Sequence, residues 1–230
     1  MAEDNTTAPN PELADAIEFA ENPEPRCPCV LLLDTSASMQ GEPIEALNQG
    51  LVTFREQLLK DPMASRRVEV AVVTFDNEIR VVQDFVTPDR FEPPRLTAQG
   101  QTFMGGAIQK ALDLIQERKQ QYRANGIAYY RPWVFMITDG APQGEPESVV
   151  QAAAQRLKHD EAAKRVAFFA VGVEGADMET LASLVVRTPV KLKGLNFAEM
   201  FVWLSRSMEA VAQSRTDEQV ALPPPGWAQV

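Results

Sequence analysis

The sequence predicts an α/β fold, a doubly wound (Rossmann-like) and mainly parallel sheet of six strands with one antiparallel strand and helices on both faces. Three observations predict it. Apolar strand patterns alternate with amphipathic helical patterns from Cys29 onward. The first strand, "CVLLLD", is continuously apolar, as expected for a strand that is buried on both faces. Two strand patterns flank Asp76 and Asn77, which indicates a hairpin and one antiparallel strand.

Each strand is expected where a short apolar or alternating run is bounded by turn residues. These runs are "CVLLLD" (29–34), "VEVAVVTF" (68–75), "EIRVVQDF" (78–85), "WVFMITD" (133–139), "VAFFAVGV" (166–173) and "VKLK" (190–193). Helices are expected where apolar residues recur at steps of three and four, as Ile44, Leu47 and Leu51 do. Such patterns cover residues 44–58, about 104–122, 147–164, 178–185 and 197–212.

These elements divide the chain into an acidic arm (1–26), one domain (27–213) and a proline-rich tail (214–230). The arm carries seven acidic residues and one basic residue, and a stripe of Leu13, Ile17 and Ala20 predicts one short helix within it. The tail contains "LPPPGW", whose prolines favour polyproline II. Trp227 leaves three alternatives open, namely docking on the domain, contact with a partner, or disorder.

Charge and composition exclude several classes of function. The formal net charge of −10 argues against electrostatic binding of nucleic acid or of an anionic membrane surface. No run approaches the roughly 18 apolar residues that a membrane-spanning helix needs. The start of the chain lacks the basic segment and apolar run of a signal peptide. We therefore expect a cytoplasmic protein.

The two cysteines, Cys27 and Cys29, are one residue apart in an extended segment. A disulfide between them would be strained. A zinc site would need further ligands, and the chain has a single histidine, His159. We expect two reduced cysteines packed at the start of a strand.

Polar side chains cluster where strands are expected to end. The stretch "DTSAS" places Asp34, Ser36 and Ser38 at alternate positions, which in extended chain face the same way. Asp139 ends a second apolar strand, and Thr102 in "GQTFMGG" precedes a helix. Ligand sites in open parallel sheets lie beyond the carboxyl ends of strands, where the strand order reverses. We therefore expect these two carboxylates and three hydroxyls to meet at one point.

This set consists entirely of hard oxygen donors, which suit Mg²⁺, Mn²⁺ or Ca²⁺ better than zinc or copper. Few direct carboxylates also leave room for the waters that Mg²⁺ gives up reluctantly. In the alternative interpretation, the match is due to chance, or Asp34 and the serines merely cap the following helix. Three such loops at predicted strand ends favour the metal site.

These residues resemble the von Willebrand factor A domain and its metal-ion-dependent adhesion site. "DTSAS" matches the family's D-x-S-x-S motif, and Thr102 and Asp139 match its threonine loop and later aspartate. The resemblance covers about residues 27–213. It implies that the serines and the threonine hold Mg²⁺ directly, that one or both aspartates act through water, and that an acidic side chain of a partner completes the coordination.

Within the family, "VTFDNEIRVVQDF" and "LNFAEMFVWLSRSM" resemble bacterial intracellular proteins of the tellurium-resistance TerY type. Such proteins are often encoded beside a protein kinase and a PP2C-type phosphatase. The resemblance therefore implies a non-enzymatic adaptor in stress response or signalling, with a kinase or phosphatase as a candidate partner. Some relatives append cysteine-rich zinc modules, and this chain has none.

Two other classes of function remain as alternatives. Asp34 after a buried strand is also typical of Mg²⁺-dependent phosphoryl-transfer enzymes and hydrolases. Haloacid-dehalogenase-type enzymes, however, have a second acid two residues further on, where this chain has Ser36. No phosphate-binding P-loop and no G-x-S-x-G elbow is present. In the third class, the domain is a structural scaffold whose arm and tail bind partners.

Overall fold

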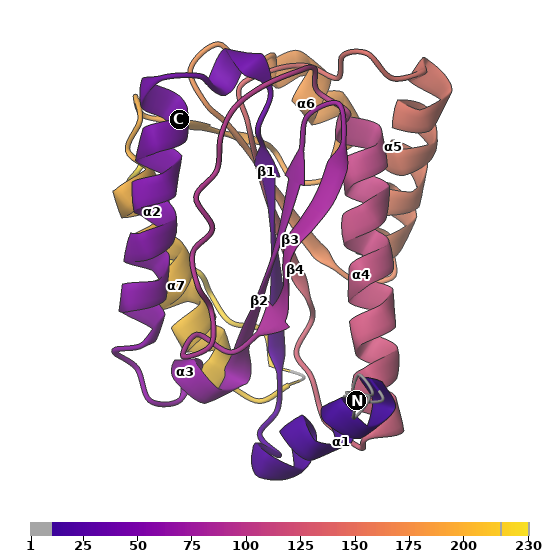
Figure 1. Cartoon of the computed structure of the whole chain (residues 1–230), viewed down its shortest axis with the longest axis vertical. Helices are drawn as coiled ribbons and strands as arrows, with labels where there is room; N and C mark the ends of the chain where they lie inside the picture. Colours follow the sequence, from indigo (N-terminus) through magenta and orange to yellow (C-terminus); the bar gives the residue numbers. More distant parts are fainter. Residues whose placement is uncertain (1–10, 217, 230) are drawn as a thin grey trace, which may run out of the picture.

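The computed structural model describes residues 11–216 and 218–229 and contains a mixed sheet between two helical layers (Figure 1). Its strands are β1 (Cys27–Asp34), β2 (Val68–Phe75), β3 (Ile79–Val86), β4 (Trp133–Thr138), β5 (Ala167–Gly172), β6 (Val190–Leu192) and β7 (Ala228–Gln229). The strand order is β3-β2-β1-β4-β5-β6-β7. Strands β3 and β7 run antiparallel to their neighbours, and the other pairs are parallel.

The predicted α/β fold class is thus confirmed, and so is the hairpin between β2 and β3. The predicted number of six strands is wrong, because the tail adds β7 to the sheet. Two residues are too few to show an alternating pattern, so β7 leaves no signal in the sequence. Residues 1–10 of the predicted arm, and residues 217 and 230 of the predicted tail, lie outside the described part of the chain.

The helices are α1 (Pro11–Glu21), α2 (Glu42–Leu58), α3 (Ala64–Arg67), α4 (Met104–Ala124), α5 (Glu147–Ala162), α6 (Met178–Leu184) and α7 (Phe197–Gln213). Helices α2 and α7 cover one face of the sheet, and α4, α5 and α6 cover the other (Figure 1). None of the helices in the described residues is long and apolar enough to cross a bilayer.

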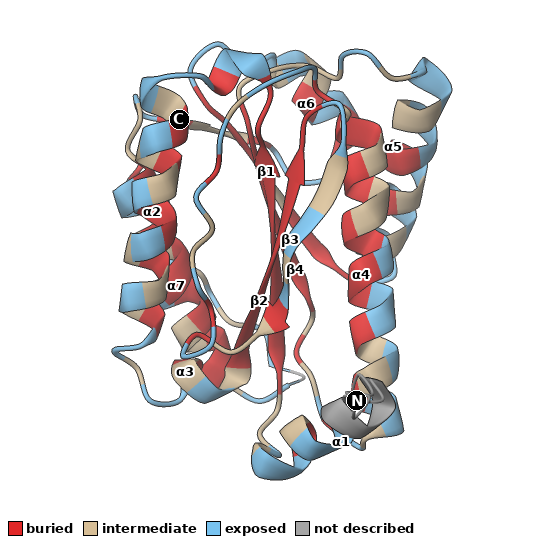
Figure 2. Cartoon of the chain, in the orientation of Figure 1, coloured by how far each residue is buried: buried red, intermediate tan, exposed pale blue. Residues whose placement is uncertain are grey.

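Strand β1 lies in the middle of the sheet, and all eight of its residues are buried (Figure 2). Leu31 and Leu33 join the core beneath α2 and α7, whereas Val30 and Leu32 join the core beneath α4 and α5. Burial on both faces is the physical reason for the continuous apolar run. Cys27 and Cys29 are free and buried in the same strand, as predicted.

The tail packs on the domain, which is the first of the three alternatives for Trp227. This side chain is only 2% exposed, and its ring meets those of Trp203 and Phe135 at centroid distances of 5.6 and 6.4 Å. The Trp203 indole N–H donates to the Pro223 carbonyl at 2.8 Å, and Lys193 N donates to the Trp227 carbonyl at 3.0 Å. The described tail residues therefore contribute to the core and to the sheet.

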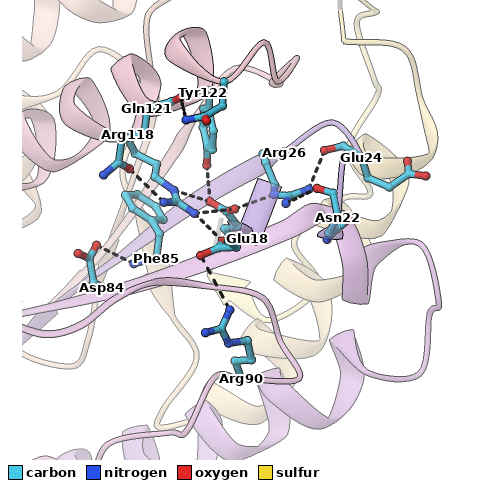
Figure 3. Close-up of polar contacts among 12 residues, drawn as sticks. Glu18, Asn22, Glu24, Arg26, Asp84, Phe85, Arg90, Arg118, Gln121 and Tyr122 are labelled. Atoms are coloured by element: carbon cyan, nitrogen blue, oxygen red, sulfur yellow. Dashed lines mark hydrogen bonds and ion pairs between the residues drawn. The ribbon is translucent and has the colours of Figure 1, made fainter. Parts of the chain in front are cut away.

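A buried carboxylate, Glu69, holds the amino end of the sheet together. Its Oε1 accepts from Arg26 Nε at 2.7 Å and from Arg118 Nη2 at 2.9 Å, and its Oε2 accepts from Arg118 Nε at 2.9 Å and from the Tyr122 hydroxyl. Glu69 and Arg26 are fully buried. Figure 3 labels Arg26, Arg118 and Tyr122 of this network, together with Glu18 of α1, which accepts from Arg118 Nη2 at 3.0 Å. The network joins α1, β1, β2 and α4.

Replacing Glu69 by glutamine should therefore destabilise the fold by about 3–5 kcal/mol, because the buried Arg26 loses its carboxylate partner and Arg118 loses one of its carboxylate partners. The free energy of unfolding from urea titration is the measurement. The matched control is Glu78→Gln, since Glu78 is a 70% exposed partner of Arg80 and solvent replaces its contacts. Equal stability of the Glu69 and Glu78 variants would contradict the structural role given to the network.

Candidate functional site

The predicted site residues lie at the carboxyl ends of β1 and β4, which are neighbours at the centre of the sheet. The chain proceeds from β1 outward to β2 and β3 on one side, and from β4 outward to β5 and β6 on the other. This is the point where the strand order reverses, and the loops that leave the two strands diverge there. Asp34 is the last residue of β1, and Asp139 follows the last residue of β4.

A chain of hydrogen bonds connects four of the five predicted residues. Ser36 N donates to Asp34 Oδ1 at 2.8 Å, and the hydroxyls of Ser36 and Ser38 are 3.0 Å apart. The Ser38 hydroxyl then donates to Asp139 Oδ1 at 2.7 Å. These bonds bring together four oxygen-bearing side chains from two loops. Ser38 and Asp139 are 101 residues apart in the sequence.

The predicted alternation of side chains along an extended chain does not account for the position of Ser38. The extended chain ends at Ser36, and Ala37–Met39 form a 3-10 turn, so simple strand alternation does not orient Ser38. The turn itself brings the Ser38 hydroxyl back over Ser36. Thr35 does point elsewhere, as expected, and its hydroxyl bonds the Phe75 carbonyl at 3.3 Å.

Thr102 reaches the same place from a third loop. Its backbone forms an antiparallel bridge with Gln143, with Thr102 N to Gln143 O at 3.2 Å and Gln143 N to Thr102 O at 3.0 Å. This bridge places the Thr102 Oγ1 atom 3.8 Å from where a Cβ on Gly140 would lie, beside Asp139. Thr102 is 4% exposed, and its hydroxyl makes no hydrogen bond with any described residue. Its oxygen is not one of the fully buried side-chain atoms that lack a partner in the described residues, so it is open to solvent and available to a ligand.

Backbone hydrogen bonds fix the threonine loop against its neighbours. Ala37 N donates to the Gly100 carbonyl at 3.1 Å, and Phe103 N donates to the Asp76 carbonyl at 3.1 Å. Asn77 Oδ1 accepts from Gln101 N at 2.6 Å. Gly100 has a φ of +75°, and a Cβ there would lie 2.7 Å from Asn77 Oδ1, so only glycine fits this close approach. The loop therefore has one well-defined position relative to β1.

Burial raises the pKa of Asp34 to about 6, although hydrogen bonds from Ser36 and Thr138 favour the ionised form. Asp139, nearby, raises it further. Burial also raises the pKa of Asp139 above its ordinary value, and the Ser38 hydroxyl partly offsets this. Two carboxylates that resist ionisation side by side are stabilised as anions by a cation between them.

The donor set therefore fits a hard divalent cation: two carboxylates and three hydroxyls, with the Thr102 hydroxyl left unbonded. No three His, Cys, Asp or Glu side chains gather in a metal-binding arrangement among the described residues. A soft-metal site of the zinc-finger type is therefore not found in this part of the chain, consistent with the all-oxygen set.

Three supporting residues were not predicted from the sequence. The Thr138 hydroxyl donates to Asp34 Oδ2 at 2.5 Å and thereby links β4 to β1 directly. Glu145 accepts from Gly105 N at 2.5 Å and from Gly106 N at 3.0 Å, which caps the amino end of α4 behind Thr102. Gln143 holds the threonine loop. Only Thr138 carried a signal, since it precedes Asp139 at the end of a strand that was predicted beside β1.

Solved structures share this fold at low sequence identity. The vWF domain of the type V pili tip protein Mfa5 from Porphyromonas gingivalis has a TM-score of 0.61 and 12% identity, covering 86% of this chain and 99% of that one. Proximal thread matrix protein 1 from the mussel byssus, in a form with a zinc-occupied MIDAS motif, has a TM-score of 0.55 and 18% identity, covering 80% and 48%.

The ArnB paralog VWA2 from Sulfolobus acidocaldarius has a TM-score of 0.51 and 16% identity, covering 80% of this chain and 45% of that one. The chain thus spans about half the length of the mussel and Sulfolobus proteins. Comparison with curated proteins finds no match. The model of the von Willebrand factor type A domain matches residues 29–199, which is most of the chain. The chain therefore belongs to the von Willebrand factor type A domain family.

Proposed function

We propose that this protein is a non-enzymatic adaptor that binds a protein partner through a divalent cation held by Asp34, Ser36, Ser38, Thr102 and Asp139. The observation that carries the proposal is the meeting of the buried Asp34 carboxylate, the half-buried Asp139 carboxylate and three hydroxyls at the strand-order reversal, with the Thr102 hydroxyl free of any described partner. Membership of the von Willebrand factor type A family supports it.

Mg²⁺ is the proposed ion, with Mn²⁺ and Ca²⁺ as alternatives. Hydroxyl and carboxylate oxygens are hard donors, and they favour these ions over zinc. The mussel protein with a zinc-occupied motif supports a divalent cation at this type of site. When bound, the ion would supply a local positive centre in a protein of net charge −10. It would thereby let an acidic side chain of a partner approach.

The cellular setting belongs to the proposal as well. The TerY-like segments support a bacterial adaptor in tellurium resistance, stress response or signalling, with a protein kinase or a PP2C-type phosphatase as a candidate partner. A cytoplasmic location is part of the same proposal, in keeping with the TerY-like segments.

Catalysis by Asp34 is the alternative function. The neighbours of its carboxylate are the Ser36 amide and the Thr138 hydroxyl, and no second acid stands at position 36 to act as a general acid. We expect no turnover of ATP or of a generic phosphatase substrate. Metal-dependent turnover that is abolished by Asp34→Asn would establish the enzyme alternative instead.

Magnesium or manganese should raise the melting temperature of the wild type but not of Asp34→Ala. A ligand that binds only the folded state stabilises it by about 2.7 kcal/mol at a concentration of a hundred times its Kd, which for a domain of this size is a shift of about 5–10 °C. The measurement is thermal unfolding with and without metal.

The control for this experiment is Asp89→Ala, which removes an exposed carboxylate outside the site. It should keep the full metal-induced shift. Shifts of equal size in Asp34→Ala and the wild type would show that the ion binds elsewhere.

Replacing Thr102 by alanine should lower the affinity for the partner more than the affinity for the metal, because the two aspartates and two serines would still hold the ion. The first step identifies the proteins of a cell lysate that the immobilised protein retains in Mg²⁺ and releases in EDTA. Their affinities for wild type and Thr102→Ala are then measured by titration calorimetry, beside the affinity of each variant for Mg²⁺ alone.

Thr53→Ala provides the matched control, since Thr53 lies on α2 and bonds only the Gln49 carbonyl of its own helix. Its affinity for the partner should equal that of the wild type. A partner that binds with undiminished affinity in EDTA would place recognition outside the metal site and contradict the proposed function.

A further inference from the structure

A second concave region lies at the opposite end of the sheet. A cavity of about 700 Å³ opens at the amino ends of β4 and β5, where Trp133 and Ala167 line it. The candidate metal site is at the carboxyl end of β4, so the two regions are separated by about 17 Å of strand. Val220 and Leu222 of the tail also line the cavity.

The cavity gathers positive charge in an acidic protein. Its basic residues come from the end of α4, the start of β4, the turn after α5 and the segment between α6 and β6. They are Lys119, Arg123, Arg131, Lys164, Arg165 and Arg187. Glu218 is the one acidic residue among the described residues that line it. The chain as a whole has a net charge of −10, so this concentration of cations is local.

Half of these cations already have carboxylate partners. Arg131 and Arg187 share Glu161, at 3.7 and 2.6 Å, and Arg165 pairs with Asp160 at 3.1 Å. Among the described residues, the six cations exceed the three carboxylates of Glu161, Asp160 and Glu218 by three charges.

The other three cations, Lys119, Arg123 and Lys164, have no carboxylate within 4.0 Å among the described residues. The carboxyl ends of α4 and α5 point to this region and carry about half a negative charge each, which reduces the positive potential without reversing it. Cations also stabilise helix ends, but Arg131 and Arg187 lie on neither helix. Helix capping alone therefore does not explain the cluster.

Two of the six cations, Lys119 and Arg131, are partly withdrawn from water, and the other four are exposed. Burial lowers the pKa of the Lys119 ammonium, and the neighbouring Arg123 lowers it further. Burial and the charge of Arg187 likewise lower the pKa of Arg131. A bound anion would stabilise the charged form of such groups, because they repel each other and are partly desolvated.

Lys164 occupies a backbone position that glycine or asparagine usually takes. Its φ is +55°, and it follows α5 in a Schellman turn, with Arg165 N bonding the Asp160 carbonyl at 2.8 Å and Lys164 N bonding the Glu161 carbonyl at 3.0 Å. The turn places an exposed ammonium at the mouth of the cavity in spite of this strain.

The rest of the lining is apolar and aromatic. Phe169 is half-buried with the Arg187 guanidinium 5.0 Å from its ring centroid, and Trp133 packs beside it at 4.8 Å. The Tyr129 ring has Arg123 at 5.9 Å and Lys119 at 6.0 Å. The lining of the cavity thus combines cations with the aromatic rings beside them, and Val220 and Leu222 add aliphatic side chains.

We propose that this cavity binds a phosphorylated small molecule that carries an aromatic ring, the chemistry of a nucleoside di- or triphosphate. Arg123, Lys119 and Lys164 would hold the phosphates, because Arg and Lys provide strong charge-assisted hydrogen bonds to phosphate oxygens. The apolar region around Phe169 would receive the ring. A volume of about 700 Å³ is in the range of small-molecule sites.

The test is calorimetric titration of the full chain with ATP in EDTA, which prevents binding through a metal ion. ATP should bind, and the double variant Arg123→Glu/Lys164→Glu should lose about 100-fold in affinity, about tenfold for each cation. Both residues are exposed, so their variants should keep the melting temperature of the wild type. Lys60→Glu, an equal charge change at an exposed residue outside the cavity, should bind ATP as the wild type does.

The identity of the ligand class is tested by two further probes. Inorganic tripolyphosphate and adenosine should each bind more weakly than ATP, because tripolyphosphate lacks the ring and adenosine lacks the phosphates. Asp34→Ala should bind ATP with the affinity of the wild type, which separates this inference from the proposed metal site.

The proposal is overturned if ATP does not bind at millimolar concentration, if the double variant binds ATP with unchanged affinity, or if tripolyphosphate binds as tightly as ATP. A glutamate-rich peptide that binds where ATP does not would assign the cavity to an acidic protein segment.

Discussion

Burying the carboxylate of Glu69 at the amino end of the sheet is the constraint on which the rest of the structure depends. An ion in the interior has to be compensated by nearby charges and hydrogen bonds, and here these come from Arg26, Arg118 and Tyr122. Arg26 immediately precedes β1, and the other two lie on α4. Satisfying one carboxylate thus fixes how α4 packs beside β1 and β2. The amino end of α4, which carries the threonine loop, is positioned by the same helix.

The two ends of the sheet differ in chemistry. At the carboxyl ends of β1 and β4, oxygen donors gather and favour a cation. At the amino ends of β4 and β5, basic side chains gather and favour an anion. The strands between them are apolar and buried, so no polar side chain of β4 connects the two regions. Strand β4 thus separates the two regions proposed as sites, and these regions are opposite in electrostatic character.

The sequence predicted the features that depend on local pattern. A strand buried on both faces requires a continuous apolar run, and "CVLLLD" has one; a polar cluster at its end is conspicuous for the same reason. The partners of Glu69 are 43 to 53 positions away from it in the sequence, and none of them stands in a recognisable motif. The only indication of this network was a charged residue inside an otherwise apolar strand. The position of Ser38 depended on a 3-10 turn, and three residues are too few for any periodicity to reveal.

Strand β7 has a consequence for how this protein behaves at high concentration. A parallel sheet that ended at β6 would expose a row of unpaired amides and carbonyls, which is a template for association with another chain. The tail covers that edge with two residues, and the three prolines that precede Gly226 cannot donate backbone hydrogen bonds to a further strand. At the other edge, register shifts between β2 and β3 interrupt the regular ladder. The Pro-Trp tail therefore covers the β6 edge of the sheet in addition to contributing Trp227 to the core.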